Sequence, residues 1–171
     1  MSVDGITGSV ASNKYTVARI NQEFGTRSTI GALVVDRSGD GTVTGSSSTD
    51  KNQTYSIDGQ WGYNDDLLFS GWVARTETPG INDKDGGFSV KMNYDSGEWA
   101  ARANYTEIEE NFNPEVGFIS RKNYKKEQYY IMRRYRPADL YGLLEVRPHI
   151  MLMNYNDFNG FKETGFDHYD I

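Results

Sequence analysis

A repeated two-residue alternation of apolar and polar side chains is the feature that most constrains the fold of this chain. Between Thr54 and Tyr63, the odd positions carry tyrosine, isoleucine, glycine and tryptophan, while the even positions are small or polar. The same pattern recurs over Phe88–Asp95 and from Trp99 to Thr106. Successive side chains of a strand point to opposite faces of a sheet, so each segment predicts a strand with one apolar and one polar face. No segment keeps the apolar i, i+3, i+4, i+7 spacing of a helix beyond two turns, and we therefore expect an all-β chain.

The alternation and the polar clusters that interrupt it predict nine strands. They are expected at Lys14–Glu23, Ser28–Asp36, Gln53–Tyr63, Leu67–Glu77, Gly87–Asp95, Glu98–Ile108, Tyr124–Tyr135, Leu143–Asn156 and Phe161–Ile171. Most of these segments are close to the roughly 9–11 residues that cross a bilayer as a tilted strand. Strands of ordinary globular proteins more often have about 5–6 residues. The lengths therefore favour strands that span a membrane.

The connections between the predicted strands alternate in length. Four are short, at 24–27, 64–66, 96–97 and 136–142, and three of the others are longer, at 37–52, 78–86 and 109–123. The eighth, at 157–160, is short and breaks the alternation. Short turns at one end and long loops at the other are typical of outer-membrane barrels, whereas a Greek-key sandwich has no reason to alternate by parity. The sequence thus predicts an antiparallel up-and-down meander of about nine strands, part of a transmembrane β-barrel.

A barrel of this kind has a lipid-facing surface and a polar interior. The apolar positions are expected on the convex, lipid-facing side: Tyr55, Ile57, Trp61, Phe88, Val90, Met92, Trp99, Ala101 and Tyr105. The polar positions are expected on the concave side: Asp58, Gln60, Lys91, Asn93, Arg102 and Asn104. A charged side chain that faces lipid costs about 2–4 kcal/mol at mid-bilayer, so Lys91 and Arg102 on the apolar face would contradict a barrel. Bacterial single-chain barrels have even strand numbers, so the first and ninth strands are not expected to pair.

Composition leaves a soluble alternative open. The chain has 171 residues, no cysteine, 13% aromatic residues and a formal net charge of −6. This length predicts one domain, the lack of cysteine excludes disulfides and thiolate sites, and the negative charge argues against a nucleic-acid partner. Many aromatic residues in a polar chain are equally typical of a soluble β-sandwich, such as a lectin-like carbohydrate-binding module.

The chain contains neither a helical membrane span nor a secretion signal. No apolar stretch reaches the roughly 18 residues of a membrane-spanning helix. The first ten residues, MSVDGITGSV, lack the basic and apolar regions of a signal peptide. We therefore expect either a cytoplasmic protein or an internal piece of a longer exported one.

Motifs that carry catalysis are weak in this sequence. There is no glycine-rich phosphate loop and no nucleophile elbow. Glu107, Glu109 and Glu110 could suggest an acid–base pair, but a solvated acidic cluster is expected where a strand enters a polar loop. His149 and His168 show no ligand spacing in the sequence. A histidine near Met151 and Met153 could bind copper, but side-chain filling of strands is the expected explanation. No catalytic residue, metal site or cofactor is therefore predicted.

The most specific motif lies at residues 109–121, which read EENFNPEVGFISR. This segment closely resembles the NFNPEVGF-type loop of a family of outer-membrane β-barrel domains of unknown function. Weaker similarities extend over nearly the whole chain, at Val17–Arg19, Ser28–Gly31, Asp58, Asn123–Tyr124 and Arg136–Pro137. The sequence departs from the family at Ile119–Ser120, where Val-Pro is usual.

In that family the barrel usually follows a family-nine-like carbohydrate-binding domain in a secreted Gram-negative protein. The resemblance implies that residues 1–171 are a single partial domain, the N-terminal part of the barrel, without the leader and the carbohydrate-binding domain. It implies an outer-membrane location, with lipid, the remainder of the barrel and a glycan as partners. The expected function is a membrane anchor or passage for a glycan-related protein. Two alternatives stay open. One is a soluble carbohydrate-binding β-sandwich. The other is part of a hydrolase whose active site lies outside this chain, since proteins of this family are commonly labelled hydrolases by association.

Charged and amide residues of the polar face and of the 109–123 segment are the candidates for lining the pore or binding a ligand. They are Arg19, Asp58, Lys91, Arg102, Glu107, Asn111, Asn113, Glu115 and Arg121. Exposed Phe112 and Phe118 would be costly, so we expect the segment to fold back with one of them inside the barrel mouth. Glu115 is then expected to face Arg19, Arg102 or Arg121. The alternative is a surface loop whose sequence only satisfies its own turns.

Overall fold

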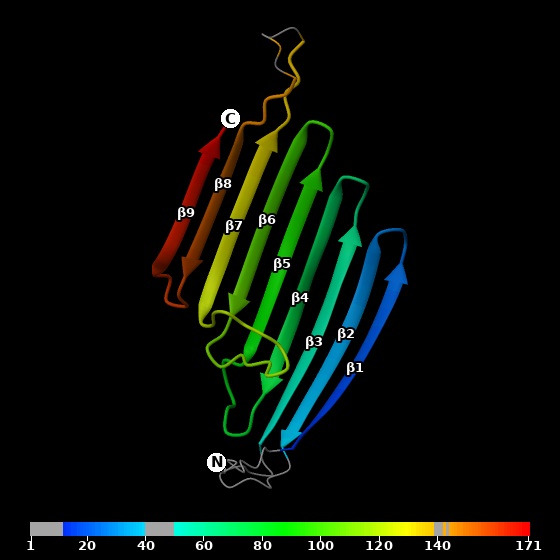
Figure 1. The fold of residues 1–171 in the computed structure, drawn as a ribbon, viewed down its shortest axis with the longest axis vertical. Helices are drawn as coiled ribbons and strands as arrows, with labels where there is room; N and C mark the ends of the chain where they lie inside the picture. Colours follow the sequence, from blue (N-terminus) through cyan, green and yellow to red (C-terminus); the bar gives the residue numbers. More distant parts are fainter. Residues whose placement is uncertain (1–11, 40–49, 139–141, 143) are drawn as a thin grey trace, which may run out of the picture.

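The computed structural model describes residues 12–39, 50–138, 142 and 144–171. These residues form one nine-stranded antiparallel sheet in which every strand pairs with the next along the chain (Figure 1). The strands are β1 Asn13–Phe24, β2 Ser28–Gly39, β3 Lys51–Gly62, β4 Leu67–Glu77, β5 Gly86–Asp95, β6 Trp99–Ile108, β7 Tyr124–Arg133, β8 His149–Asn156 and β9 Lys162–Asp170. β1 and β9 lie at opposite edges and do not pair, as expected for an odd strand number. Within the described residues, no helix is long and apolar enough to cross a membrane.

The predicted strand ends agree with the observed ones to within three residues, except at β8. That strand was expected from residue 143, which lies outside the described residues, and it begins at His149. Pro148 has no N–H to donate to a ladder, which explains the late start. Before it, Tyr135 and Val146 form only an isolated bridge.

The late start of β8 also changes the pattern of connections. Residues 25–27, 63–66 and 96–98 form short turns at one end of the sheet, and residues 78–85 and 109–123 form longer loops at the other (Figure 1). The connection between β2 and β3 lies largely outside the described residues. The seventh connection, from Arg133 to His149, was predicted to be short and is long. The alternation therefore holds through β7 and fails after it.

The strand register separates the two faces of the sheet. Residues directly opposite each other on paired strands point to the same face. Ile57 lies opposite Val73, which lies opposite Phe88, and this row belongs to the face that we call the apolar face. Lys91 lies opposite Asn104, and Arg102 opposite Asn93, on the other face, the polar face. The register confirms that the nine predicted apolar side chains share one face and the six predicted polar ones share the other.

A small hydrophobic core lies on the polar face at the long-loop end of the sheet. Ala74 of β4 and Ile108 of β6 are buried there together with Phe112 from the loop between β6 and β7. Trp72 and Tyr124 pack against this cluster. The apolar face, by contrast, leaves large side chains exposed. In a soluble sheet with one buried face, the apolar face is the covered one. In this sheet the loop covers part of the polar face, and the apolar face is exposed.

Candidate functional site

The 109–123 loop is anchored to the polar face by a buried aromatic ring. Phe112 is only 3% exposed, and its ring stacks on that of Trp72 with a centroid distance of 6.3 Å. Phe118, six positions later, is 89% exposed. The prediction that one of these two rings is buried is confirmed on the polar face of the sheet, and the ring is Phe112. Removing a phenylalanine side chain from water is worth about 1.5–3 kcal/mol, which offsets part of the entropy lost on ordering the loop.

Two buried polar side chains of the sheet hold the backbone of the loop. Asn52 at the start of β3 and Thr76 at the end of β4 are each 1% exposed. The Asn52 amide donates to the Asn113 carbonyl at 2.9 Å and accepts from the Glu115 N–H at 3.3 Å. The Thr76 hydroxyl oxygen accepts from the Asn113 N–H at 3.0 Å. A buried polar group without a hydrogen-bond partner destabilises the fold. These bonds give partners both to the buried side chains of the sheet and to the backbone of the loop, and they therefore fix the position of the loop.

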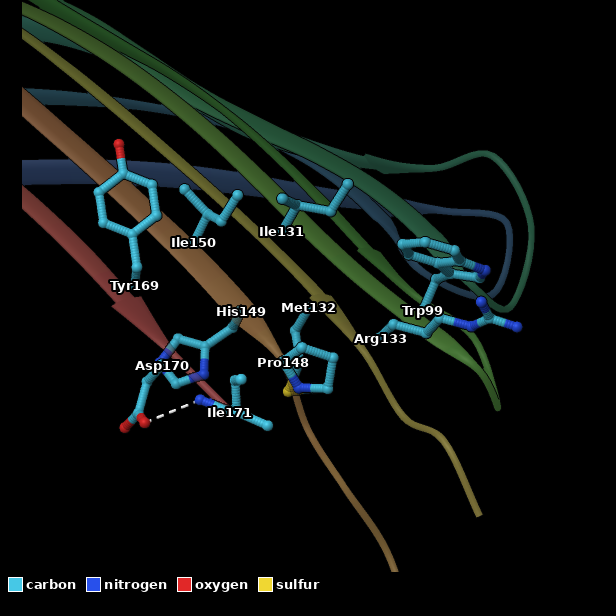
Figure 2. Close-up of a pocket in the computed structure, with 10 residues that line it drawn as sticks. All are labelled: Trp99, Ile131, Met132, Arg133, Pro148, His149, Ile150, Tyr169, Asp170 and Ile171. Atoms are coloured by element: carbon cyan, nitrogen blue, oxygen red, sulfur yellow. Dashed lines mark hydrogen bonds between the residues drawn. The ribbon is translucent and has the colours of Figure 1, made fainter. Parts of the chain in front are cut away.

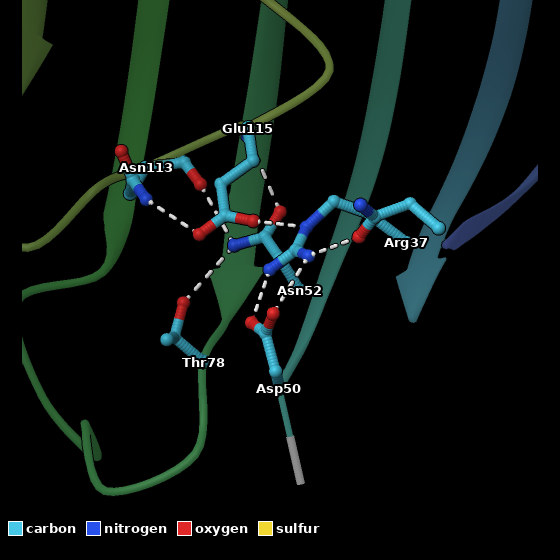
Figure 3. Close-up of polar contacts among 7 residues, drawn as sticks. Arg37, Asp50, Asn52, Thr78, Asn113 and Glu115 are labelled. Carbon is cyan, nitrogen blue, oxygen red and sulfur yellow. Dashed lines mark hydrogen bonds and ion pairs between the residues drawn. The ribbon is translucent and has the colours of Figure 1, made fainter. Parts of the chain in front are cut away.

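An arginine of β2 completes the attachment. Figure 3 shows the Arg37 guanidinium between the carboxylates of Glu115 and Asp50, and it forms an ion pair with each. The Arg37 side chain is 12% exposed. Its hydrogen bond holds the pKa of Asp50 below its usual range. The expectation that Glu115 faces Arg19, Arg102 or Arg121 is therefore wrong, because the loop reaches across the sheet to β2. We call Arg37, Asn52, Thr76, Phe112 and Glu115 the clasp.

The other predicted polar-face residues lie along the sheet away from the clasp. Arg19 of β1 and Asp58 of β3 form an ion pair at 2.7 Å across the glycine of β2 that separates them. A side chain at Gly31 would lie 3.0 Å from the Arg19 guanidinium, so this position has little room for one. Arg102 lies over the ring of Tyr130 at 5.2 Å. These pairs place charge of both signs on the polar face.

The far end of the loop contacts the opposite edge of the sheet. Arg121 forms an ion pair with Glu163 of β9 and lies 4.9 Å from the ring centroid of Tyr155 in β8. Tyr155 also faces Tyr124, with ring centroids 5.3 Å apart. The loop therefore contacts β2 through Glu115 and β9 through Arg121.

Glu107 lies on the opposite face of the sheet from the other candidate pore-lining or ligand-binding residues. It lies opposite Phe88 on the apolar face, 3.6 Å from the Lys125 ammonium. Glu109 instead accepts from the Gly86 N–H at 2.6 Å, and Glu110 lies 3.5 Å from the Lys84 ammonium. The three glutamates thus have separate partners, and a paired acid–base arrangement is not formed among them.

Asn111 connects the two long loops at this end of the sheet. Its side chain donates to the Asp83 carbonyl at 2.9 Å, and its N–H donates to the Lys84 carbonyl at 2.8 Å. Lys122 reaches back to the Asn113 side chain at 3.0 Å. The loop is thus an ordered cover over part of the polar face, lying across the lower ends of β4–β6 in Figure 1.

Sequence reasoning missed Arg37, Asn52 and Thr76. Arg37 and Asn52 were assigned to a connection, and Thr76 had no distinguishing feature beyond its place near a strand end. Asn52 and Arg37 lie opposite each other in the register. Had the predicted strands β2 and β3 extended as far as the observed ones, the sequence would have indicated that Arg37 and Asn52 share a face. It would not have indicated that the 109–123 loop reaches them.

Comparison of the chain with family models, with curated proteins and with solved structures finds no match.

Proposed function

We propose that this chain forms part of the wall of a transmembrane β-barrel in a Gram-negative outer membrane, where it serves as an anchor or gated passage. The observation that carries the proposal is the exposed apolar face. Ile57, Val73 and Val90 occupy neighbouring strands and are each more than half exposed, at 55%, 55% and 54%. Covering each of them would gain roughly 1 kcal/mol, about half the value of burying such a side chain completely. Lipid is the occupant that would cover such a face along its whole width.

Aromatic residues at the ends of the apolar runs support lipid as the occupant. In β3 the run extends from Tyr55 to Trp61, and in β6 it extends from Trp99 to Tyr105. Outer-membrane barrels place aromatic girdles at both membrane interfaces, with an apolar band about 25 Å tall between them. From Tyr55 to Trp61 the strand spans about 20 Å at roughly 3.3 Å per residue, most of the height of such a band. Charged side chains also enter this face, including Arg75 in β4, Glu107 in β6, Glu127 in β7 and Asp167 in β9. Arg75 and Glu107 lie near the long-loop ends of their strands, so the uncharged band of β3–β6 covers the rest of those strands.

The clasp favours an anchor or gated passage over an open pore. If the polar face lines the interior of a barrel, the 109–123 loop attached to this face also lies inside, across the mouth of the barrel. The loop is fixed by buried groups, Phe112 and Asn52 among them, so it would narrow the mouth persistently. A glycan remains the proposed cargo or partner class on the family resemblance alone.

The alternative functions find less support. A soluble β-sandwich needs two sheets packed face to face, and the described residues form one sheet. A hydrolase is the third proposal, with an active site outside this chain.

The three tryptophans provide a direct test of lipid contact. Trp61 and Trp99 lie on the apolar face, whereas Trp72 lies on the polar face beneath Phe112. Three variants would each keep one tryptophan and carry phenylalanine at the other two positions. Each would be folded into phosphatidylcholine vesicles with brominated acyl chains, which quench nearby tryptophan fluorescence.

We expect strong quenching of Trp61 and Trp99 and little quenching of Trp72. Vesicles without bromine provide the reference for each variant. Equal quenching at all three positions, or none at Trp61, would contradict a lipid-facing apolar face.

A further inference from the structure

Two histidines and an aspartate meet on the polar face of the β8–β9 hairpin. His149 lies directly opposite Asp170, and His168 precedes Asp170 by two positions on the same strand. One ligand atom from each of the three side chains lies within 4.8 Å of the others. The histidines are 19 positions apart in sequence and show no motif, but antiparallel pairing makes the two rings neighbours, with centroids 5.1 Å apart.

The immediate surroundings leave nitrogen and oxygen atoms available for a ligand. The Nδ1 atom of His149 lies 3.2 Å from the Arg147 carbonyl, which favours a proton on Nδ1 and a lone pair on Nε2. The Nε2 atom of His168 lies 3.9 Å from Asp170 Oδ2, too far for a hydrogen bond. Figure 2 shows His149 and Asp170 on one side of the strands, with Ile150 and Tyr169 on the other.

We propose that His149, His168 and Asp170 bind a divalent transition-metal ion of the Zn²⁺ or Cu²⁺ class. Imidazole nitrogens and a carboxylate are ligands that these ions prefer. With bonds of about 2.0–2.1 Å, tetrahedral ligand atoms are roughly 3.4 Å apart, and rotation of the side chains would close the present separation. Three protein ligands leave at least one coordination position for water or another group.

Methionine sulfur near the site extends the range of ions. Met151 lies opposite His168, and Met132 lies opposite His149, so both belong to the polar face. Thioether sulfur favours Cu(I), so copper supplied as Cu(I) would gain a further ligand if Met151 or Met132 approached the ion. This inference concerns the C-terminal edge of the sheet and does not depend on whether the apolar face contacts lipid.

The test is titration of the full chain, folded in detergent micelles, with Zn²⁺ in a calorimeter and with Cu²⁺ in an electron paramagnetic resonance experiment. We expect a 1:1 isotherm at micromolar Zn²⁺ and a copper spectrum with coupling to two nitrogens. His149→Gln and His168→Gln should each weaken Zn²⁺ binding at least about tenfold, since the loss of even an outer-shell partner costs that much. Each should also leave coupling to one nitrogen.

Asp167→Asn is the matched control, because Asp167 is on β9 but opposite Leu152, on the apolar face. It should bind Zn²⁺ as the parent does, whereas Asp170→Asn should bind more weakly. Circular dichroism of every variant must show the parent β-structure. Absence of Zn²⁺ binding below millimolar concentration would overturn the proposal, and so would parent-like affinity in either histidine variant.

Discussion

Phe112→Ala should release the 109–123 loop from the sheet while leaving the strands paired. Phe112 is 3% exposed and packs against Trp72, Ala74 and Ile108. Replacing a buried phenylalanine by alanine typically costs 3–5 kcal/mol, through lost burial and the cavity that remains. The backbone bonds of the strands do not depend on this ring, because each strand pairs with its sequence neighbours. The cost should therefore appear as local opening of the loop.

Hydrogen exchange at the Asn113 amide measures that opening. In the closed loop its N–H donates to the Thr76 hydroxyl at 3.0 Å. A change of 1.4 kcal/mol corresponds to a factor of ten in an equilibrium constant, so about 3 kcal/mol predicts a fall in protection of about 100-fold. The fluorescence of Trp72 should change as well, since Phe112 stacks on its ring.

Phe118→Ala is the matched control within the same loop. Phe118 is 89% exposed, so the same chemical change should shift stability by no more than about 0.5 kcal/mol. Equal loss of Asn113 protection in both variants would refute the assignment of Phe112 as the anchor. Unchanged protection in Phe112→Ala would refute it also.

Two further predictions concern charge. If the apolar face contacts lipid at mid-bilayer, Val90→Lys should lower the free energy of unfolding from vesicles, measured by urea titration, by about 2–4 kcal/mol. Asn93→Lys, on the polar face of the same strand, should not lower it. Equal effects of the two substitutions would contradict the assignment of the faces. The hydrogen bond from Arg37 lowers the pKa of Asp50 in the folded chain. The stability that Asp50 contributes to the clasp is therefore fully present above the unfolded pKa of an aspartate, near 4. It should be lost as the pH falls through the lower pKa of the folded chain. Trp72 fluorescence should follow this loss below about pH 4 in the parent chain and much less in Asp50→Asn, and identical acid profiles would exclude Asp50.

The strands were predictable because their side-chain pattern is local. Alternation over Thr54–Tyr63 places β3 and both of its faces without knowledge of any partner. The same reasoning failed at the start of β8, where the pattern suggested a strand through Pro148. Ladder pairing there needs a donor that proline does not have.

The clasp and the histidine cluster were less predictable because both depend on distant pairing. The burial of one phenylalanine in the loop followed from its cost in water, but the partner of Glu115 did not. Arg37 is 78 positions away in sequence, and only the sheet order brings it near. In the same way, His149 and His168 become neighbours through the register of one hairpin. A turn fixes the register within one hairpin, but no local pattern indicates that the 109–123 loop reaches a strand as distant as β2.

The loop provides the contacts that a meander otherwise does not have. In the described part of the chain, the strands contact only the strands next to them in sequence, so little resists changes in the curvature of the sheet. The loop links β2 to β9 through two ion pairs. The Arg121–Glu163 pair is more than one-third exposed at both ends, and such pairs contribute about 0–1 kcal/mol. Phe112 and Asn52 are buried, and their loss would cost several times more. The buried groups therefore contribute most to keeping the loop closed over the polar face, and the exposed pair with Glu163 contributes little.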